Sequence, residues 1–322
     1  MTFKTSVDWL KFRTLSEPSQ ALEALRPAFG TAGDLVQFGP QLRGREGWVA
    51  RKQITLAGDV PIGSVDFGGE SQRGWVRFDF PGSGCGWIQD WRHVECMPAL
   101  VEQASIRRLD IAFTTYQGEV THEMVINAHD AQQFGNGGRH PFRRVITSDD
   151  RWAGRTVYVG NRAGAKFLRC YEKGLEVISK ALATGFKPSD SLMCEFDGYG
   201  YADPLKVYRV EVELKPVDCQ VVPWSAVCSE RDSVFAGAYP FCASLLPGAM
   251  PVVCDRLPDV APRRALANGL ENCRRSYGAI IRAALLAYGG DADRVMRAIA
   301  SDEPAKALIE AGVLTVDHVP RT

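Results

Sequence analysis

The sequence predicts an α+β fold with two related units of mixed sheet and helix, consistent with an internal duplication, followed by a C-terminal helical tail. Segments that alternate apolar and polar residues, separated by glycine turns, recur along the first two thirds of the chain. Segments with helical spacing lie between them. After about residue 260 the apolar residues recur only with the helical period. Together these observations favour sheets with helices packed on one face and a separate helical end.

The composition is typical of a globular protein. Of the 322 residues, 45% are hydrophobic and 24% are charged, which suits one large domain or two ordinary ones. The N-terminus does not resemble a signal peptide and no apolar run is long enough to span a membrane, so we expect a cytoplasmic protein without a membrane partner. The nine cysteines form no CxxC pair and no zinc-ligand pattern, so we interpret them as reduced, small apolar residues.

The first unit is predicted to span residues 1–104. Alternation predicts strands at 5–12, 47–57, 62–69 and 74–80, and a short helix at 97–104. The second unit is predicted to span residues 105–215. Its expected strands are 106–116, 155–161, 166–173 and 206–215, and its expected helices are 121–134, behind a Thr121 cap, and 174–185.

The two units resemble each other in the order of their elements. Each begins with a strand that carries an internal aspartate, Asp8 in the first unit and Asp110 in the second. Each also contains a strand–glycine–strand block, at 62–80 and at 155–173. This repetition is the reason to expect a duplication.

Two further segments complete the predicted organisation. Residues 216–262 are rich in proline and lack a sustained period, which indicates a connector with some short helices. Residues 263–322 are the helical tail. Within it, a helix over 262–290 ends in two glycines, Asp291 caps a second helix to about residue 300, and 304–312 is expected to add a short one.

The charge is balanced overall but not locally. The chain has 38 basic and 38 acidic residues, so its net charge does not indicate a nucleic-acid partner. Between residues 139 and 187, however, eleven Lys and Arg residues stand against four acidic ones. This segment is interpreted either as a solvated basic face or as a surface that follows phosphates.

Acidic residues gather on two predicted strands. A period of two puts Arg209, Glu211 and Glu213 on one face of their strand and leaves the apolar residues between them for the core. The same alternation turns Asp110 away from the core. If the strands are neighbours, three carboxylates converge, and such oxygen ligands suit Mg²⁺ or Mn²⁺. The alternative is an exposed sheet face with ordinary surface acids.

A tyrosine on the strand at 166–173 is the candidate nucleophile. Tyr171 lies between Arg169 and Lys173 in the sequence. A strand tyrosine can simply pack, but beside cations it can also attack a phosphate, since positive charge favours the phenolate and stabilises the transition state. Tyr158 on the preceding strand is the rival nucleophile, although its valine neighbours indicate packing.

Together the motifs resemble the replication initiation factors of filamentous phages and related rolling-circle plasmids. The matching segments occur in the family's order over residues 5–240, and they read "VDWL", "RRLDIAFTTYQGE", "GRTVYVGNRAGAKFLRCYEKG", "YRVEVELK" and "FAGAYP". The tyrosine segment is the most specific of them. The chain has no HxH pair, so it does not resemble the two-histidine class of tyrosine nickases.

The resemblance implies an enzyme that cuts one strand of a double-strand origin, stays on the 5′ phosphate through a tyrosine, leaves a 3′ hydroxyl and later rejoins the strand. It implies Tyr171 as nucleophile, Asp110 and Glu211 as ligands of Mg²⁺ or Mn²⁺ with Glu213 beside them, and Arg169, Lys173 and Arg209 as the basic residues.

The resemblance also implies a DNA-binding or scaffold role for the first unit and catalysis for the second. Origin DNA is the expected partner, together with a host helicase and polymerase. The resemblance also implies a homodimer and a location in the cytoplasm of a bacterial host. Glu172 stays open as an alternative ligand. A catalytically inactive origin-binding protein is the alternative function; no P-loop, GxSxG or GxGxxG motif in its required context supports a small-molecule enzyme.

Overall fold

The computed structural model describes residues 4–135, 140–148, 150, 152–185, 193–196, 199–217, 221–254 and 261–301, with only the backbone at 261–268 and 272. The chain forms two compact units, Met1–Asp255 and Arg256–Thr322. The first is a large α+β unit and the second is helical. The predicted fold class is therefore confirmed, whereas the division into four segments stays a prediction.

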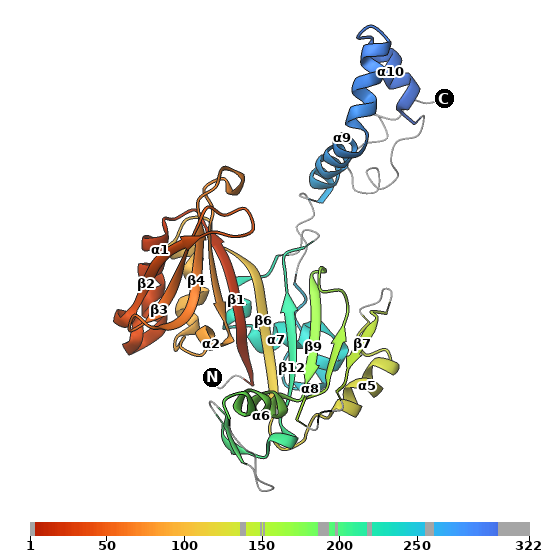
Figure 1. Ribbon diagram of the computed structural model, residues 1–322. Helices are drawn as coiled ribbons and strands as arrows, with labels where there is room; N and C mark the ends of the chain where they lie inside the picture. The colour runs from red at the N-terminus through yellow and green to blue at the C-terminus, as the bar shows by residue number, and fades with distance from the viewer. Residues whose placement is uncertain are drawn as a thin grey trace. The chain divides into compact units, whose positions relative to one another are not determined.

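The first unit is built on one ten-stranded antiparallel sheet (Figure 1). Its strands are β1 (Thr5–Thr14), β2 (Val36–Arg43), β3 (Ala50–Leu56), β4 (Val60–Phe67), β5 (Val76–Pro81), β6 (Ser105–Thr115), β7 (Arg143–Ile146), β8 (Thr156–Val159), β9 (Lys166–Tyr171) and β12 (Tyr208–Leu214). They lie in the order β2-β3-β4-β5-β1-β6-β12-β9-β8-β7. A separate hairpin is formed by β10 (Cys194–Phe196) and β11 (Gly200–Ala202).

The strand order repeats within the sheet. From the centre of the sheet outward, the first half has the order β1, β5, β4, β3, β2, and the second half has the order β6, β12, β9, β8, β7. If the strands of each half are numbered one to five along the chain, both halves have the order one, five, four, three, two. Thus β1 corresponds to β6 and β4 to β9, whereas the sequence comparison set 62–80 against 155–173. Both halves share a single sheet across the β1–β6 pair. A duplication of the chain stays a prediction.

Most helices of the first unit cover the apolar face of the sheet. In chain order the helices are α1 (Pro18–Leu25), α2 (Gly82–Cys85), α3 (Trp91–Glu95), α4 (Met97–Leu100), α5 (His122–Asp130), α6 (Lys173–Ala183), α7 (Arg231–Ala238) and α8 (Pro240–Leu245). Helix α6 lies on the polar face, where Glu176 and Lys180 line the same pocket as Tyr171. Leu22 of α1, Val125 of α5 and Phe235 of α7 join strand residues such as Phe12 and Val212 in one buried cluster. Because side chains alternate along a strand, the same packing turns the polar residues of β1, β6 and β12 to the opposite face.

Most predicted elements are present. Thr121 caps α5 by accepting a hydrogen bond from the Met124 amide, as its position predicted. The helix expected at 97–104 ends at Leu100 because Val101 has an extended backbone. Strands β2 and β7 were not predicted. Within the predicted connector, α7 and α8 contribute buried residues to the core of the first unit.

The second unit contains α9 (Ala261–Ala287) and α10 (Ala292–Ile299), which confirms the predicted helical tail. Gly289 and Gly290 both have positive φ and separate the helices. Asp291 caps α10 through a hydrogen bond from the Arg294 amide. The helix predicted at 304–312 lies outside the described residues.

None of the helices in the described ranges is both long and apolar enough to cross a membrane. The cysteines that the structure describes are free thiols. Cys85, Cys170, Cys228 and Cys242 are buried, in keeping with their interpretation as small apolar residues.

Candidate active site

The acidic face of β12 is buried. Glu211 and Glu213 are only 3% and 5% exposed, and Asp110 of the neighbouring β6 is fully buried. The apolar residues between them, Val210 and Val212, pack into the core as predicted. The acids are therefore not ordinary surface residues, and their burial needs compensating positive charge.

The register of the central strands brings the predicted site residues together. Strand β12 lies between β6 and β9. In this register Glu213 is opposite Asp110, Glu211 is opposite Arg169, and Arg209 is opposite Tyr171. Residues far apart in the sequence thus share one sheet face because β12 is inserted between the other two strands.

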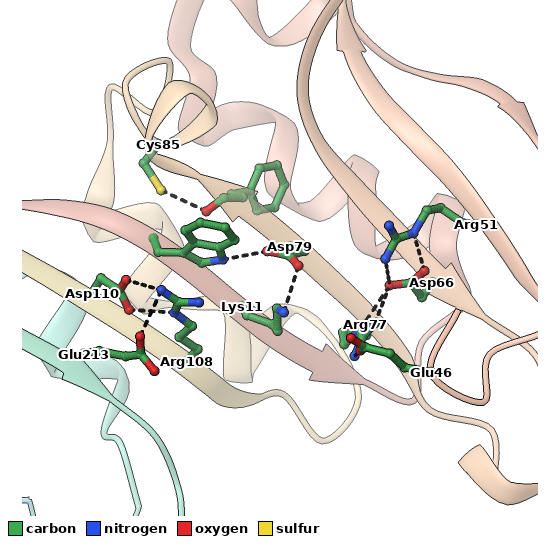
Figure 2. Close-up of polar contacts among 12 residues, drawn as sticks. Lys11, Glu46, Arg51, Asp66, Arg77, Asp79, Cys85, Arg108, Asp110 and Glu213 are labelled. Atoms are coloured by element: carbon green, nitrogen blue, oxygen red, sulfur yellow. Dashed lines mark hydrogen bonds and ion pairs between the residues drawn. The ribbon is translucent and has the colours of Figure 1, made fainter. Parts of the chain in front are cut away.

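Arginine side chains neutralise the buried acids. The Arg108 Nε and Nη2 atoms donate to the two carboxylate oxygens of Asp110 at 2.8 and 2.6 Å, and Nη2 also lies 3.1 Å from Glu213 Oε2 (Figure 2). Arg169 Nη2 lies 2.7 Å from both carboxylate oxygens of Glu211. Glu213 has a second partner, since Lys215 Nζ is 2.6 Å from its Oε1.

Asp8 is a member of the cluster that the sequence did not single out as a site residue. The β1–β6 register shifts between Val7 and Trp9, so Asp8 occupies a β-bulge, which re-aims its side chain. Its Oδ1 atom lies 2.6 Å from Arg209 Nη1. The signal in the sequence was the internal aspartate of "VDWL", but nothing in an alternating pattern indicates a bulge.

Burial and like charges raise the pKa of two carboxylates. Burial raises the pKa of Glu211 to about 7, against the opposing effect of Arg169 and with a further contribution from Asp8. Burial also raises the pKa of Asp110, although its hydrogen bonds from Arg108 oppose the change. Negative charge is therefore costly here, and an added cation would be favourable.

The carboxylates fit a divalent cation in their chemistry, since they are hard oxygen ligands. Asp110 and Glu213 lie so close that one Arg108 nitrogen contacts both. In the described part of the chain, however, no group of three or more His, Cys, Asp or Glu residues is arranged to hold a metal ion. The guanidinium group of Arg108 supplies the positive charge between these two acids.

Tyr171 is at the end of β9 and is 8% exposed. Its ring lies beneath two cations, with the Arg169 guanidinium carbon 4.9 Å and the Lys173 Nζ atom 5.8 Å from the ring centroid. Burial raises the pKa of Tyr171 far above its usual range, although the charge of Arg209 opposes this. The phenol is thus protonated near neutral pH. Lys173 begins α6, where its Nζ atom pairs with Glu176 at 2.8 Å.

The two alternatives named from the sequence have distinct surroundings. Tyr158 lines the same pocket of about 420 Å³ as Tyr171, and its ring stacks on Phe167 at 5.6 Å. Glu172 belongs to a different polar group, because Arg155 donates to its carboxylate from the backbone amide and from the guanidinium. Arg169 thus contacts both the Tyr171 ring and Glu211, whereas Glu172 forms its ion pair with Arg155.

Comparison with known proteins agrees with the motifs. Residues 104–253 match the sequence family described as "Replication initiation factor". This segment contains Tyr171, Asp110 and all of β12, and over it the resemblance found in the sequence is confirmed.

The chain is also similar to the solved structure of a rolling circle replication initiator protein from Geobacillus stearothermophilus. The sequence identity is 17% and the TM-score is 0.48, with 72% of this chain and 83% of that chain covered. No curated protein matches the chain.

Proposed function

We propose that the protein initiates rolling-circle replication by cutting one strand of a double-strand DNA origin and later rejoining it, with Tyr171 as the nucleophile. The observation that carries the proposal is the position of Tyr171 opposite Arg209, with the Arg169–Glu211 pair beside it, within the segment that matches replication initiation factors. A nucleophile, cations and buried acids on one face are the parts that phosphate transesterification requires.

In the proposed cut, the Tyr171 Oη atom attacks the scissile phosphorus. A bond forms between that oxygen and phosphorus, and the bond from phosphorus to the 3′ oxygen breaks. The phenol proton is lost and the leaving 3′ oxygen gains a proton, which gives a 5′-phosphotyrosine and a free 3′ hydroxyl. Rejoining is the reverse attack by a 3′ hydroxyl. No water is consumed, so the energy of the phosphodiester is kept.

The basic residues have a defined part in this chemistry. Arg209 is partly buried beside Tyr171, and its charge favours the phenolate that forms during attack. Arg169 lies on the other side, where its guanidinium contacts both the tyrosine ring and Glu211. Both cations would stabilise the extra negative charge of the pentavalent transition state. Lys173 would act at longer range from the start of α6.

The proposed cofactor is Mg²⁺ or Mn²⁺, held by Asp110 and Glu211 with Glu213 beside them. When bound, such an ion polarises the phosphate that is attacked. The proposed partners are the origin duplex and its nicked strand, with a host helicase and polymerase and a second copy of the chain. Action on phage or plasmid DNA would place the protein in the cytoplasm of a bacterial host.

The test is to incubate supercoiled DNA that carries the cognate origin with the protein, in Mg²⁺ or in EDTA, and to map any protein–DNA adduct. We expect a nick only in Mg²⁺, with DNA on Tyr171. Tyr171→Phe should abolish the adduct, whereas Tyr158→Phe, the matched control from the same pocket, should retain it.

Three results would change the conclusion. Nicking by Tyr171→Phe would remove the proposed nucleophile. An adduct on Tyr158 would keep the activity and move the site. Origin binding without a nick in Mg²⁺ would favour an origin-binding protein that lacks the chemistry.

A further inference from the structure

A second hollow lies on the polar face of the sheet, over β3, β4 and β5. Its volume is about 960 Å³. Its lining includes Arg43 at the end of β2, Arg45 two residues after it and Arg51 of β3. Trp9 and Asp79 line it nearer the sheet centre. We call it the β3–β5 groove. Between these side chains the lining consists largely of small residues, which leaves the hollow open.

The groove corresponds in strand order to the pocket of Tyr171. That pocket lies over β8 and β9, the third and fourth strands of their half, and the groove lies over β3 and β4, the third and fourth strands of theirs. Among its lining residues the groove has no tyrosine or histidine; it has arginines instead. The groove therefore has no counterpart of the Tyr171 phenol among its lining residues.

The groove is positively charged. Arg43 and Arg45 are exposed, and no carboxylate within the described ranges forms an ion pair with either. The Arg51 Nε atom lies 2.6 Å from Oδ1 of the fully buried Asp66 (Figure 2). The Arg51 side chain, which lines the groove, is 23% exposed. The one carboxylate in the lining, Asp79, is held by Lys11 at 2.9 Å and by the Trp9 indole at 2.7 Å. In the described part of the chain, the unpaired positive charge of the groove thus comes from Arg43 and Arg45, because Arg51 and Asp79 each have a partner of opposite charge.

Trp9 connects the β3–β5 groove with the candidate active site. The indole lines the groove and is partly exposed. The guanidinium of Arg108 lies 4.2 Å from the centroid of the same ring, and Arg108 in turn binds Asp110 and Glu213. An aromatic ring between a basic groove and a site for phosphate chemistry is the combination with which proteins hold unpaired nucleic-acid strands.

We propose that the β3–β5 groove binds single-stranded DNA, with Arg43, Arg45 and Arg51 contacting phosphates and Trp9 stacking on a base, and that it leads the strand to Tyr171. The proposal rests on the proposed function, because it assigns a path to the strand that Tyr171 would cut. It commits to a single strand because stacking on Trp9 requires an unpaired base face.

The test measures the affinity of the full-length protein for a labelled oligothymidylate by fluorescence anisotropy, in EDTA and over a series of salt concentrations. A single-strand phosphate contact contributes about 0.7 to the slope of log affinity against log salt, so Arg43→Gln with Arg45→Gln should reduce the slope by about 1.4. Trp9→Leu should lower the affinity about tenfold without changing the slope, and Trp9→Phe should restore most of it.

The control removes two exposed basic residues outside the groove, Lys4→Gln with Arg92→Gln, and should leave the slope unchanged. An unchanged slope in the Arg43 and Arg45 variant would overturn the proposal. A slope that falls for duplex DNA but not for oligothymidylate would overturn the choice of a single strand. Since EDTA and oligothymidylate exclude origin cleavage, this assay can succeed even if Tyr171 proves not to be the nucleophile.

Discussion

Replacing Asp66 with asparagine tests how the polar face of the sheet is held together. Asp66 is fully buried on β4 and accepts four hydrogen bonds from two arginines of the neighbouring strands, Arg51 and Arg77, at 2.6 to 3.1 Å. The amide side chain would keep the shape but turn a donor toward one guanidinium, and it would leave Arg51 without its counter-ion and Arg77 with Glu46 alone. Loss of one partner of a buried pair costs about 3–5 kcal/mol. Since the arginines are 23% and 15% exposed, water would compensate in part, and we expect about 3 kcal/mol.

The loss should depend on pH in a defined direction. Burial alone would raise the pKa of Asp66, but the hydrogen bonds from Arg51 and Arg77 outweigh it and hold the pKa below its ordinary value of 3.8. A carboxyl with a lowered pKa stabilises the fold above its unfolded pKa and loses that contribution as the pH falls through the folded one. The difference in the free energy of unfolding between the wild type and Asp66→Asn should therefore be constant near neutral pH and become smaller in acid.

The assay is urea unfolding of both proteins at neutral and acidic pH. The matched control is Glu46→Gln, because Glu46 contacts the same Arg77 at 2.7 Å but is 71% exposed, and it should cost less than about 1 kcal/mol. A loss below about 1 kcal/mol for Asp66→Asn, or a loss that does not change with pH, would refute the reasoning.

Two further predictions concern the half of the sheet that contains Tyr171. Burial raises the pKa of Glu211 from the ordinary 4.5 to about 7, so its contribution to stability should fall as the pH rises through that interval. As the pH rises from 4.5 to about 7 in EDTA, the free energy of unfolding of Glu211→Gln should therefore increase by about 3 kcal/mol relative to that of the wild type. Unfolding free energies from urea titrations that follow the same pH dependence in both proteins would contradict this. Gly174→Ala should destabilise the fold by about 2 kcal/mol, because its Cβ atom would collide with the Pro204 backbone beside α6. Gly248→Ala, with open space around its Cβ position, is the control, and equal thermal unfolding of the two variants would speak against the collision.

The period-two pattern predicted which residues of β12 face the core. Val210 and Val212 could be assigned to the interior because alternation is a local property of a strand. The caps at Thr121 and Asp291 were equally local, since each depends on a side chain and an amide three residues later. That the two acidic strands are neighbours could only be assumed from the sequence, because strand pairing depends on the topology of the whole sheet.

What the sequence did not reveal is long-range or irregular. The bulge at Asp8 breaks the alternation on which strand assignment depends. The arginine partners of the acids could not be assigned, because Arg108 and Glu213 meet only through the β6–β12 register. Strand β2 was missed since Gly39 and Pro40 interrupt its pattern, and both lie where its register with β3 shifts.

The place of β12 in the sheet has a consequence for how the chain is made. It is the last strand in the sequence to join the sheet, yet it lies between β6 and β9. While the ribosome has not yet released residues 208–214, β6 and β9 each have an open edge and Tyr171 has neither Arg209 nor Glu211 beside it. A nascent or truncated chain is therefore unable to assemble the site. The order of synthesis would thus keep the proposed chemistry off until the α+β unit is nearly complete.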